Sequence, residues 1–335
     1  MYIERRALVV GIDTYQNASN LSSCVSDAKA VGKLLEEHAD QTPNYLCRVL
    51  LDSTEDGQPI TRAALRGACE ELFANDDGDV LFYFSGHGVV TPFGGHLCAY
   101  DSKRGDWGVP MQEIVQLAMN SRARDIIMIL DCCHAGDIAD PSVFGGRGGD
   151  PLALLRENMT VLAASLKTQP AVEVGGHGLF TASLLDALGG CAADHMGWVT
   201  APSIYAYVER RFGSWGERQR PVYKSYATSV RVVRECAPLL DRAKLRRLVE
   251  LFPAQEHKYR LTPGHEPEDE HGKVRKPVDK EKVEVARLFK DYRDAGLLKP
   301  SIPDEQLYWT ARRRHTVELT LRGQEYWWLV KNKKI

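Results

Sequence analysis

The stretch DIIMILDCCHAG, residues 125–136, decides the fold and raises the functional question. Its first part is a continuous apolar run of the kind that forms a buried strand. The run ends in two adjacent cysteines and a histidine. Neighbouring strand residues point to opposite faces, so Cys132 and Cys133 would make a poor metal chelate and a strained disulfide. Core packing and nucleophilic catalysis remain as the main alternatives.

Similar apolar runs alternate with segments of helical periodicity along the first two thirds of the chain. This alternation predicts an α/β fold, a mostly parallel sheet flanked by helices on both faces. Catalytic groups in such sheets gather at the carboxyl ends of the strands. The other predicted strands are 5–13, 45–51, 79–85 and 159–165, and the predicted helices are 24–38, 61–75, 110–120, 180–188 and 202–212.

Length and composition narrow the class of protein. At 335 residues the chain exceeds one typical domain, which predicts a second, smaller unit. Its 44% apolar and 26% charged residues are typical of a globular protein with a buried core. No apolar run reaches membrane-spanning length, and the amino terminus lacks a signal segment, so we expect a cytoplasmic protein without a membrane partner. Its eight cysteines should then be mostly reduced.

The character of the sequence changes after about residue 240. We predict a second domain over 238–335, with a charged linker or loop at about 256–282 and an amphipathic helix within 283–300. Residues 308–330 contain two strand-like runs around the basic turn Arg312–Arg314, then an aromatic helix or strand. From residue 241 onward Lys and Arg exceed Asp and Glu by 22 to 16, whereas the remainder is acidic. The two parts are therefore expected to meet different partners.

Two glycine-rich stretches, 144–151 and 172–180, could suggest phosphate binding. Neither follows a strand and opens a helix as a phosphate-binding loop does. We interpret both as mobile surface loops.

Chemistry is expected at two strand ends, YFSGHG (83–88) and ILDCCHAG (129–136). His87 lies between glycines, which allow close approach of another backbone. A lone buried cysteine is usually core, and a lone histidine usually satisfies a hydrogen bond. A cysteine and a histidine at two neighbouring strand ends instead favour covalent acyl transfer, with thiolate attack and imidazolium protonating the leaving amine. Backbone N–H groups of Gly88 and the cysteine could form the oxyanion hole.

These two motifs resemble those of the caspase-like cysteine peptidases, in particular the metacaspase and prokaryotic caspase (orthocaspase) branch. The resemblance covers roughly residues 5–235, including ALVVGIDTY, GGHGLFTASLLDAL and QRPVY, and implies a caspase-like peptidase domain over 1–237. The motif Asp-x-Cys-His implies that Cys133 is the nucleophile and Cys132 the variable position. His87 is then the base and acid, and His134 a structural neighbour.

The resemblance also implies a pocket for the residue that precedes the scissile bond. Its residues in this sequence are Cys24, Asp27, Ser85 and Asp131. Two carboxylates at its base favour Arg or Lys, whereas an Asp-directed caspase would need basic residues there. The alternative for Asp27 alone is a carboxylate interacting with a helix N-terminus.

Two further expectations concern the regulation of the expected peptidase activity. Many metacaspases are activated by calcium, but the segment after His87 is poor in carboxylates, so we predict no cofactor, no metal and no calcium dependence. Arg147 lies between glycine pairs in the segment after the nucleophile, where an Arg-directed peptidase could cut itself. An uncut loop is the equal alternative.

The tail resembles, less sharply, a winged-helix module. Its expected partners are an activating protein, a small signalling ligand or nucleic acid at Arg312–Arg314. The combined prediction is a cysteine endopeptidase that cleaves proteins at exposed Arg or Lys and is held inactive until a signal acts through the tail. The branch it resembles includes prokaryotic forms that act in stress or antiviral defence. The alternatives are an inactive scaffold and a nucleic-acid- or ligand-binding regulator.

Overall fold

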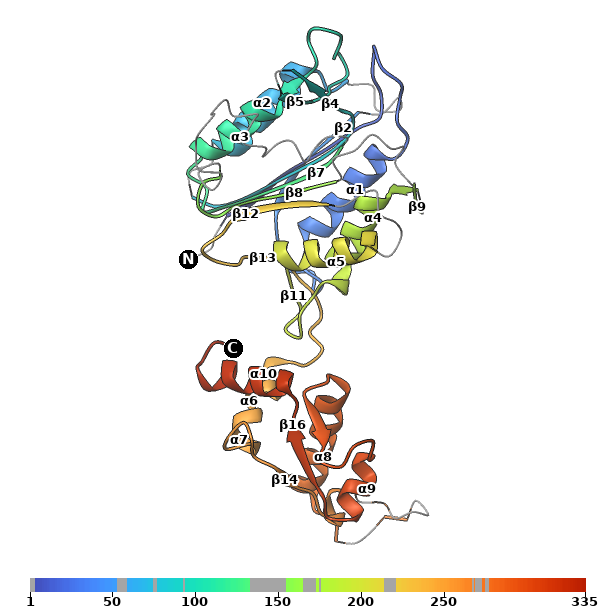
Figure 1. Ribbon diagram of the computed structural model, residues 1–335, viewed down its shortest axis with the longest axis vertical. Helices are drawn as coiled ribbons and strands as arrows, with labels where there is room; N and C mark the ends of the chain where they lie inside the picture. The colour runs from blue at the N-terminus through green and yellow to red at the C-terminus, as the bar shows by residue number, and fades with distance from the viewer. Residues whose placement is uncertain are drawn as a thin grey trace. The chain divides into compact units, whose positions relative to one another are not determined.

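The computed structural model of the protein describes most of the chain. The described residues are 4–52, 59–74, 77–92, 94–132, 155–164, 173–174, 176–213, 221–266, 268, 273–274 and 277–335. They belong to two compact units, the amino-terminal unit Met1–Ala237 and the carboxy-terminal unit Pro238–Ile335 (Figure 1).

A six-stranded sheet forms the centre of the amino-terminal unit. Its strand order is β12-β8-β7-β3-β1-β2, and every neighbouring pair is parallel except β12 with β8. The predicted α/β fold with a mostly parallel sheet is thus confirmed. The strands are β1 (Arg5–Ile12), β2 (Leu46–Asp52), β3 (Asp79–Ser85), β7 (Asp125–Asp131), β8 (Met159–Ala163) and β12 (Val222–Tyr226).

Helices cover both faces of this sheet (Figure 1). On one face lie α2 (Arg62–Phe73) and α3 (Met111–Asn120), and on the other lie α1 (Cys24–Glu36), α4 (Leu179–Asp186) and α5 (Ala201–Gly213). Because both faces are covered, β3 is buried at all of its positions. This accounts for the continuous apolar runs in the sequence.

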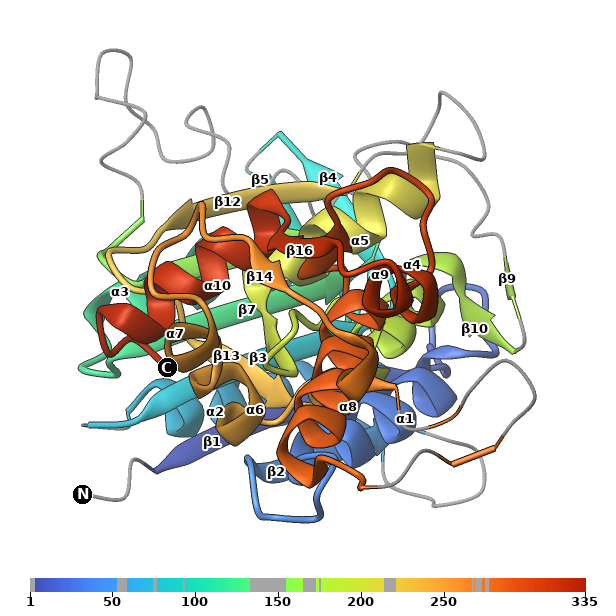
Figure 2. The ribbon, with the colours of Figure 1, turned by 90° about the horizontal axis from the view of Figure 1, so that it is seen from below.

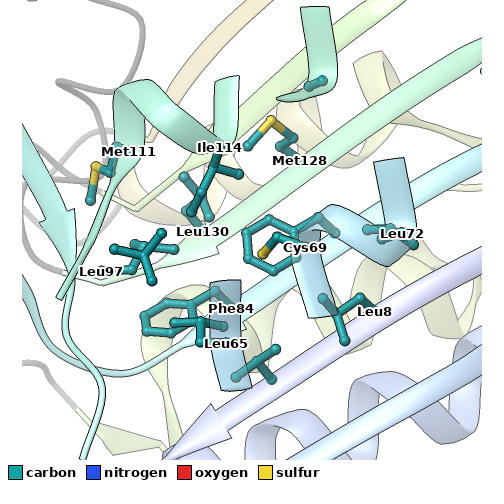
Figure 3. Packing of buried hydrophobic residues seen from close by; sticks show 14 of the residues in the cluster. Leu8, Leu65, Cys69, Leu72, Phe84, Leu97, Met111, Ile114, Met128 and Leu130 are labelled. Atoms are coloured by element: carbon teal, nitrogen blue, oxygen red, sulfur yellow. The ribbon is translucent and has the colours of Figure 1, made fainter. Parts of the chain in front are cut away.

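The alternation of side chains along the strands divides the core into two clusters. Leu8, Phe84 and Met128 pack beneath α2 and α3 (Figure 3). Their strand neighbours Val9 and Ile127 pack against α1, α4 and α5. The two clusters are therefore separate environments. Side chains at alternate positions of a strand enter alternate clusters.

Shorter elements border the sheet. A small antiparallel sheet contains β4 (Gly88–Thr91), β5 (Gly94–Leu97) and β6 (Val109–Pro110), and β11 (Trp198–Thr200) pairs with β13 (Val232–Glu235). β9 (Glu173–Val174) pairs with β10 (His177–Gly178), which leads directly into α4 (Figure 2). The π-helical turn η4 (Ala187–Cys191) follows α4.

The start of α1 is held against the carboxyl end of β1. A Cβ at Gly11 would lie 2.3 Å from the backbone oxygen of Cys24, so only glycine permits this approach. The carboxylate of Asp13 accepts hydrogen bonds from the backbone N–H groups of Cys24 (2.9 Å) and Val25 (3.2 Å). These bonds satisfy N–H groups that a helix start leaves without partners. The first turn of α1 is thereby fixed beside the strand ends.

The carboxy-terminal unit combines short helices with a three-stranded antiparallel sheet of order β14-β16-β15. Its core is aromatic: the rings of Tyr259 and Phe289 lie 5.0 Å apart, and those of Phe252 and Phe289 lie 5.7 Å apart. The elements are α6 (Arg242–Arg246), α7 (Leu248–Leu251), β14 (Tyr259–Arg260), η5 (Pro263–His265), α8 (Lys280–Asp294), β15 (Leu298–Pro300), α9 (Leu307–Arg312), β16 (Thr316–Leu319) and α10 (Leu321–Lys331).

One local prediction for this unit needs correction. The first strand-like run near residue 308 is the helix α9, because Leu307, Thr310 and Ala311 are buried at helical spacing. The helix predicted within 283–300 is α8, and it ends before Gly296, which was predicted to stop it and has a φ of 71°. The described part of 256–282, the predicted linker or loop, contributes β14 and the buried His265.

Candidate active site

His87 follows the central strand β3 and is fixed by contacts to the segment after β1. Its backbone N–H donates to the Tyr15 hydroxyl (2.8 Å), which in turn donates to the Ile12 carbonyl (3.0 Å). The Tyr15 and His87 rings lie 4.6 Å apart. Burial raises the pKa of Tyr15, so its hydroxyl remains a donor. Tyr15 is a positioning residue that the sequence did not reveal.

A second contact determines which tautomer the neutral His87 ring adopts. The Nε2 atom of His87 lies 2.8 Å from the carbonyl oxygen of Ser19. A carbonyl can only accept, so the neutral ring carries its hydrogen on Nε2. Nδ1 is then the nitrogen with a lone pair that can take a proton. This is the arrangement required of a general base.

The neighbouring strand β7 ends beside β3. Ser85 and Asp131 are paired in register, and the backbone N–H of Gly86 lies 3.3 Å from the Asp131 carbonyl oxygen. Cys132 is 6% exposed and packs with the cluster beneath α2 and α3. Asp131 points to the opposite side, as strand alternation predicts. Cys133, His134 and Arg147 lie outside the described residues.

The four predicted pocket residues lie close together at these strand ends, where the Cys24 thiol also contacts the Ser85 hydroxyl. The Ser85 hydroxyl lies 3.4 Å from Oδ2 of Asp27. A Cβ placed on Gly178 would lie 3.2 Å from Oδ2 of Asp131 and 3.7 Å from Oδ2 of Asp27, so both carboxylates border the space beside this glycine. Cys24, one helical turn before Asp27, is also buried.

The environment of the two carboxylates disfavours their charge. Asp27 is 1% exposed, and burial, helped by the nearby charge of Asp131, raises its pKa to about 6. Burial also raises the pKa of Asp131. Two acids that share one low-dielectric space strongly favour a cation between them. The two buried acids are therefore electrostatically suited to a cationic partner.

Two residues that sequence reasoning missed orient Asp131. The Thr181 hydroxyl donates to Oδ2 of Asp131 at 2.6 Å. Its oxygen lies 2.6 Å from the Tyr83 hydroxyl, which must then be the donor in that contact. Both Thr181 and Tyr83 are fully buried. They fix the direction in which Asp131 presents its other oxygen.

A third missed residue is His177, in a stretch predicted to be a mobile surface loop. That prediction was wrong for residues 177–178, which form β10 and lie at the pocket. Nδ1 of His177 lies 2.6 Å from Oδ1 of Asp27. The two residues are 150 positions apart, so no local sequence signal could have paired them.

The remaining predicted residues are placed as follows. Gly88, expected in the oxyanion hole, begins β4 immediately after His87 and pairs with Leu97.

Within the described ranges, three or more His, Cys, Asp or Glu side chains do not gather as a metal site would require. None of the described helices is both long and apolar enough to cross a bilayer.

Comparisons with known proteins show which family the chain resembles. The sequence profile described as "Caspase domain" matches residues 4–232. Metacaspase-1 of Cryptococcus neoformans is 26% identical over 179 residues, and Metacaspase-4 of Arabidopsis thaliana is 28% identical over 153. These alignments cover 49% and 41% of this chain, but only 39% and 34% of the two relatives. A solved structure of a Geobacter sulfurreducens protein matches with a TM-score of 0.48 and 16% identity, covering 68% of this chain and 94% of that one.

The profile covers more than half of the chain, and its match coincides with the unit that contains the six-stranded sheet. The fold is a caspase fold, with a mostly parallel central sheet flanked by helices. The family and the metacaspase relatives support a cysteine protease at low identity. The chain belongs to the caspase domain family.

Proposed function

We propose that this protein is a cysteine endopeptidase that cleaves polypeptides after Arg or Lys. The observation that carries the specificity is the pair of buried carboxylates, Asp27 and Asp131, beside the strand that leads to His87. A guanidinium can bind two carboxylates with parallel hydrogen bonds, and an ammonium can pair with them as a point charge. An acidic substrate side chain would add a third negative charge to the pocket.

The proposed chemistry uses Cys133 as nucleophile and His87 as base. Nδ1 of His87 accepts the thiol proton, and the thiolate attacks the carbonyl carbon of the scissile peptide bond. The imidazolium returns that proton to the leaving amine as the C–N bond breaks. Water, deprotonated by the imidazole, then hydrolyses the thioester and regenerates the thiol. Backbone N–H groups of Gly88 and Cys133 would stabilise the oxyanion in both steps.

The hydrogen bond between His87 and Ser19 supports this sequence of proton transfers. A carbonyl acceptor at Nε2 keeps Nδ1 available for the thiol and stabilises the imidazolium once it forms. The buried position of Cys132 on the opposite face supports Cys133, rather than Cys132, as the nucleophile.

The decisive experiment compares fluorogenic peptides that differ only in ending with Arg, Lys or Asp. The wild-type chain should cleave after Arg and Lys. Cys133→Ala and His87→Ala should abolish turnover, while Cys132→Ala should retain it. Cleavage after Asp, or turnover that survives Cys133→Ala, would contradict the proposal. Titration with an arginine-based covalent thiol reagent, followed by mass spectrometry, identifies the reactive cysteine even in an enzyme that awaits its signal.

The carboxy-terminal unit is proposed to be the regulatory part. In this reading a protein, small ligand or nucleic acid acts on a winged-helix-like module and releases a peptidase used in prokaryotic stress or antiviral defence. Cleavage at Arg147 would be a second route of activation. Deleting 238–335 or replacing Arg147 by Gln should change basal turnover or the appearance of cleaved chains on denaturing gels.

One observation weighs against nucleic acid as the ligand of this unit. Arg313, in the basic turn, pairs with Glu305 at 3.1 Å and lies over the Trp309 ring at 5.3 Å. Its charge is therefore partly neutralised before any phosphate arrives. A salt-dependent mobility shift of the full-length Cys133→Ala chain with DNA or RNA would nevertheless favour the alternative function, a nucleic-acid-binding regulator.

A further inference from the structure

The pocket carboxylate Asp27 already has a basic partner within the chain. Nδ1 of His177 lies 2.6 Å from its Oδ1 atom. The side chain of Asp27 is 2% exposed, whereas that of His177 is 26% exposed. One member of the pair is thus fixed inside the protein, and the other retains a route to solvent.

His177 contacts the carboxylate that the proposed function assigns to the substrate. A guanidinium that bound Asp27 through both oxygens would need Oδ1, which the imidazole occupies. The second carboxylate is arranged differently: Asp131 is held by the neutral hydroxyl of Thr181. Among the described residues, an imidazole therefore contacts Asp27, whereas a hydroxyl contacts Asp131.

The backbone on either side of His177 is held independently of its ring. The Ser26 hydroxyl of α1 lies 3.2 Å from the carbonyl oxygen of Gly176. Gly178 fits so closely that an added Cβ would lie 3.2 Å from Asp131. Rotation of the imidazole away from Asp27 consequently does not require these backbone contacts to break.

We propose that the imidazole of His177 occupies Oδ1 of Asp27 in the specificity pocket, and that the Arg or Lys side chain of a substrate displaces it. This inference rests on the proposed function, because it needs a basic substrate side chain to enter the pocket. Displacement makes substrate binding weaker than two open carboxylates would allow. In return, the imidazole reduces the cost of burying two acids without a ligand.

The test measures binding without turnover, in full-length Cys133→Ala protein. The probes are a labelled acetylated tripeptide amide that ends in arginine and its match that ends in citrulline, which is neutral and nearly isosteric. Affinities are measured by fluorescence anisotropy at about pH 8.5, well above the pKa of about 6 of Asp27. Four proteins are compared: the Cys133→Ala background and the same background with His177→Ala, His177→Gln or Ser26→Ala.

The expected result is that His177→Ala binds the arginine peptide about tenfold more tightly, because no hydrogen bond to the Asp27 carboxylate must be broken first. The affinity for the citrulline peptide should stay unchanged. His177→Gln should lie between the two, since its more flexible amide can still donate to Asp27, and it also provides a readout if the alanine variant folds poorly. Ser26→Ala, the matched control that loosens the backbone but keeps the ring, should bind like the background.

The alternative outcomes separate the two proposals. If the arginine peptide binds better than the citrulline peptide in the background but His177→Ala binds it equally or more weakly, the displacement inference is wrong. The proposed preference of the pocket for basic side chains then stands. The same conclusion follows if His177→Ala increases the affinity for both peptides equally, because the imidazole would then hinder binding only by its size. If arginine never binds better than citrulline in any variant, both the inference and the proposed specificity fall.

Discussion

Acidic residues lie at both ends of the strand pair β3 and β7, and their surroundings differ between the two ends. Asp79 and Asp125 are paired in register at the amino ends, and Asp131 lies opposite Ser85 at the carboxyl ends, near Asp27. Burial raises the pKa of Asp125 to about 6 and that of Asp27 to about 6, and a nearby carboxylate contributes to each shift. Both ends of the sheet therefore bury negative charge at a similar cost.

The two ends of the strands differ in the group that compensates the buried negative charge. At the amino ends, the Arg5 guanidinium lies 3.7 Å from Asp79 and also donates to the Tyr45 hydroxyl (2.8 Å) and the Val232 carbonyl (2.6 Å). Arginine is always charged, and these bonds fix its position. At the carboxyl ends the partner is an imidazole with partial exposure. The first pair is therefore structural, and the second is the one from which we propose that a substrate cation displaces the imidazole.

The largest effect is expected from removing the fixed cation. Arg5→Ala should lower the free energy of unfolding by about 3–5 kcal/mol, because it leaves the buried Asp79 without its ion-pair partner and the Val232 carbonyl without this donor. Denaturant unfolding measures this change. Arg48→Ala, which removes an exposed pair with Glu71, is the control and should cost less than about 1 kcal/mol. Equal costs for the two variants would mean that Arg5 does not hold the amino ends together.

The next effect concerns specificity. Asp27→Asn should lower kcat/KM for arginine peptides by about a hundredfold, close to the loss of one charged, bidentate contact. Asp125→Asn, the matched change at the other end of the sheet, should alter kcat/KM less than about threefold. Steady-state kinetics with arginine and citrulline peptides distinguishes the two. A comparable loss in both variants would remove the functional contrast between the strand ends.

The pH dependence should show the same contrast. As the pH falls through about 6, Asp27 takes up a proton, so KM for arginine peptides should rise about tenfold by about pH 5. Citrulline peptides should show no such rise. Raised carboxyl pKa values also mean that the native state binds these protons more tightly than the unfolded state, so stability falls as the pH rises from about 4 to about 6. Asp125→Asn should reduce that slope without changing the KM profile.

The smallest effect is expected at Tyr15. Tyr15→Phe removes the hydroxyl between the backbone of His87 and the Ile12 carbonyl, so kcat should fall about three- to tenfold. KM and the preference for arginine over citrulline should not change, because the carboxylate pocket is untouched. A shift in that preference would show that Tyr15 acts on the pocket instead.

The sequence predicted the sheet because its strands are buried on both faces and read as continuous apolar runs. His87 could be named as a candidate from its place between glycines at a strand end, whereas the pocket residues Asp27 and Asp131 came from resemblance. His177, Thr181 and Tyr15 were missed because each acts through a contact made by the fold. The error at α9 has another cause, since its aromatic residues have high strand propensity, which tertiary burial overrode.

The opposite orientations of Asp131 and Cys132 bear on how relatives should be aligned. A gap of one position inside β7 would exchange the two residues across the sheet, placing a carboxylate in the apolar cluster and a thiol in the pocket. A shift of one residue moves every following side chain of the strand to the opposite face, and no smaller shift preserves the pairing with the neighbouring strands. Homologous sequences should therefore align through β7 without insertions or deletions, even where the helices around it vary in length.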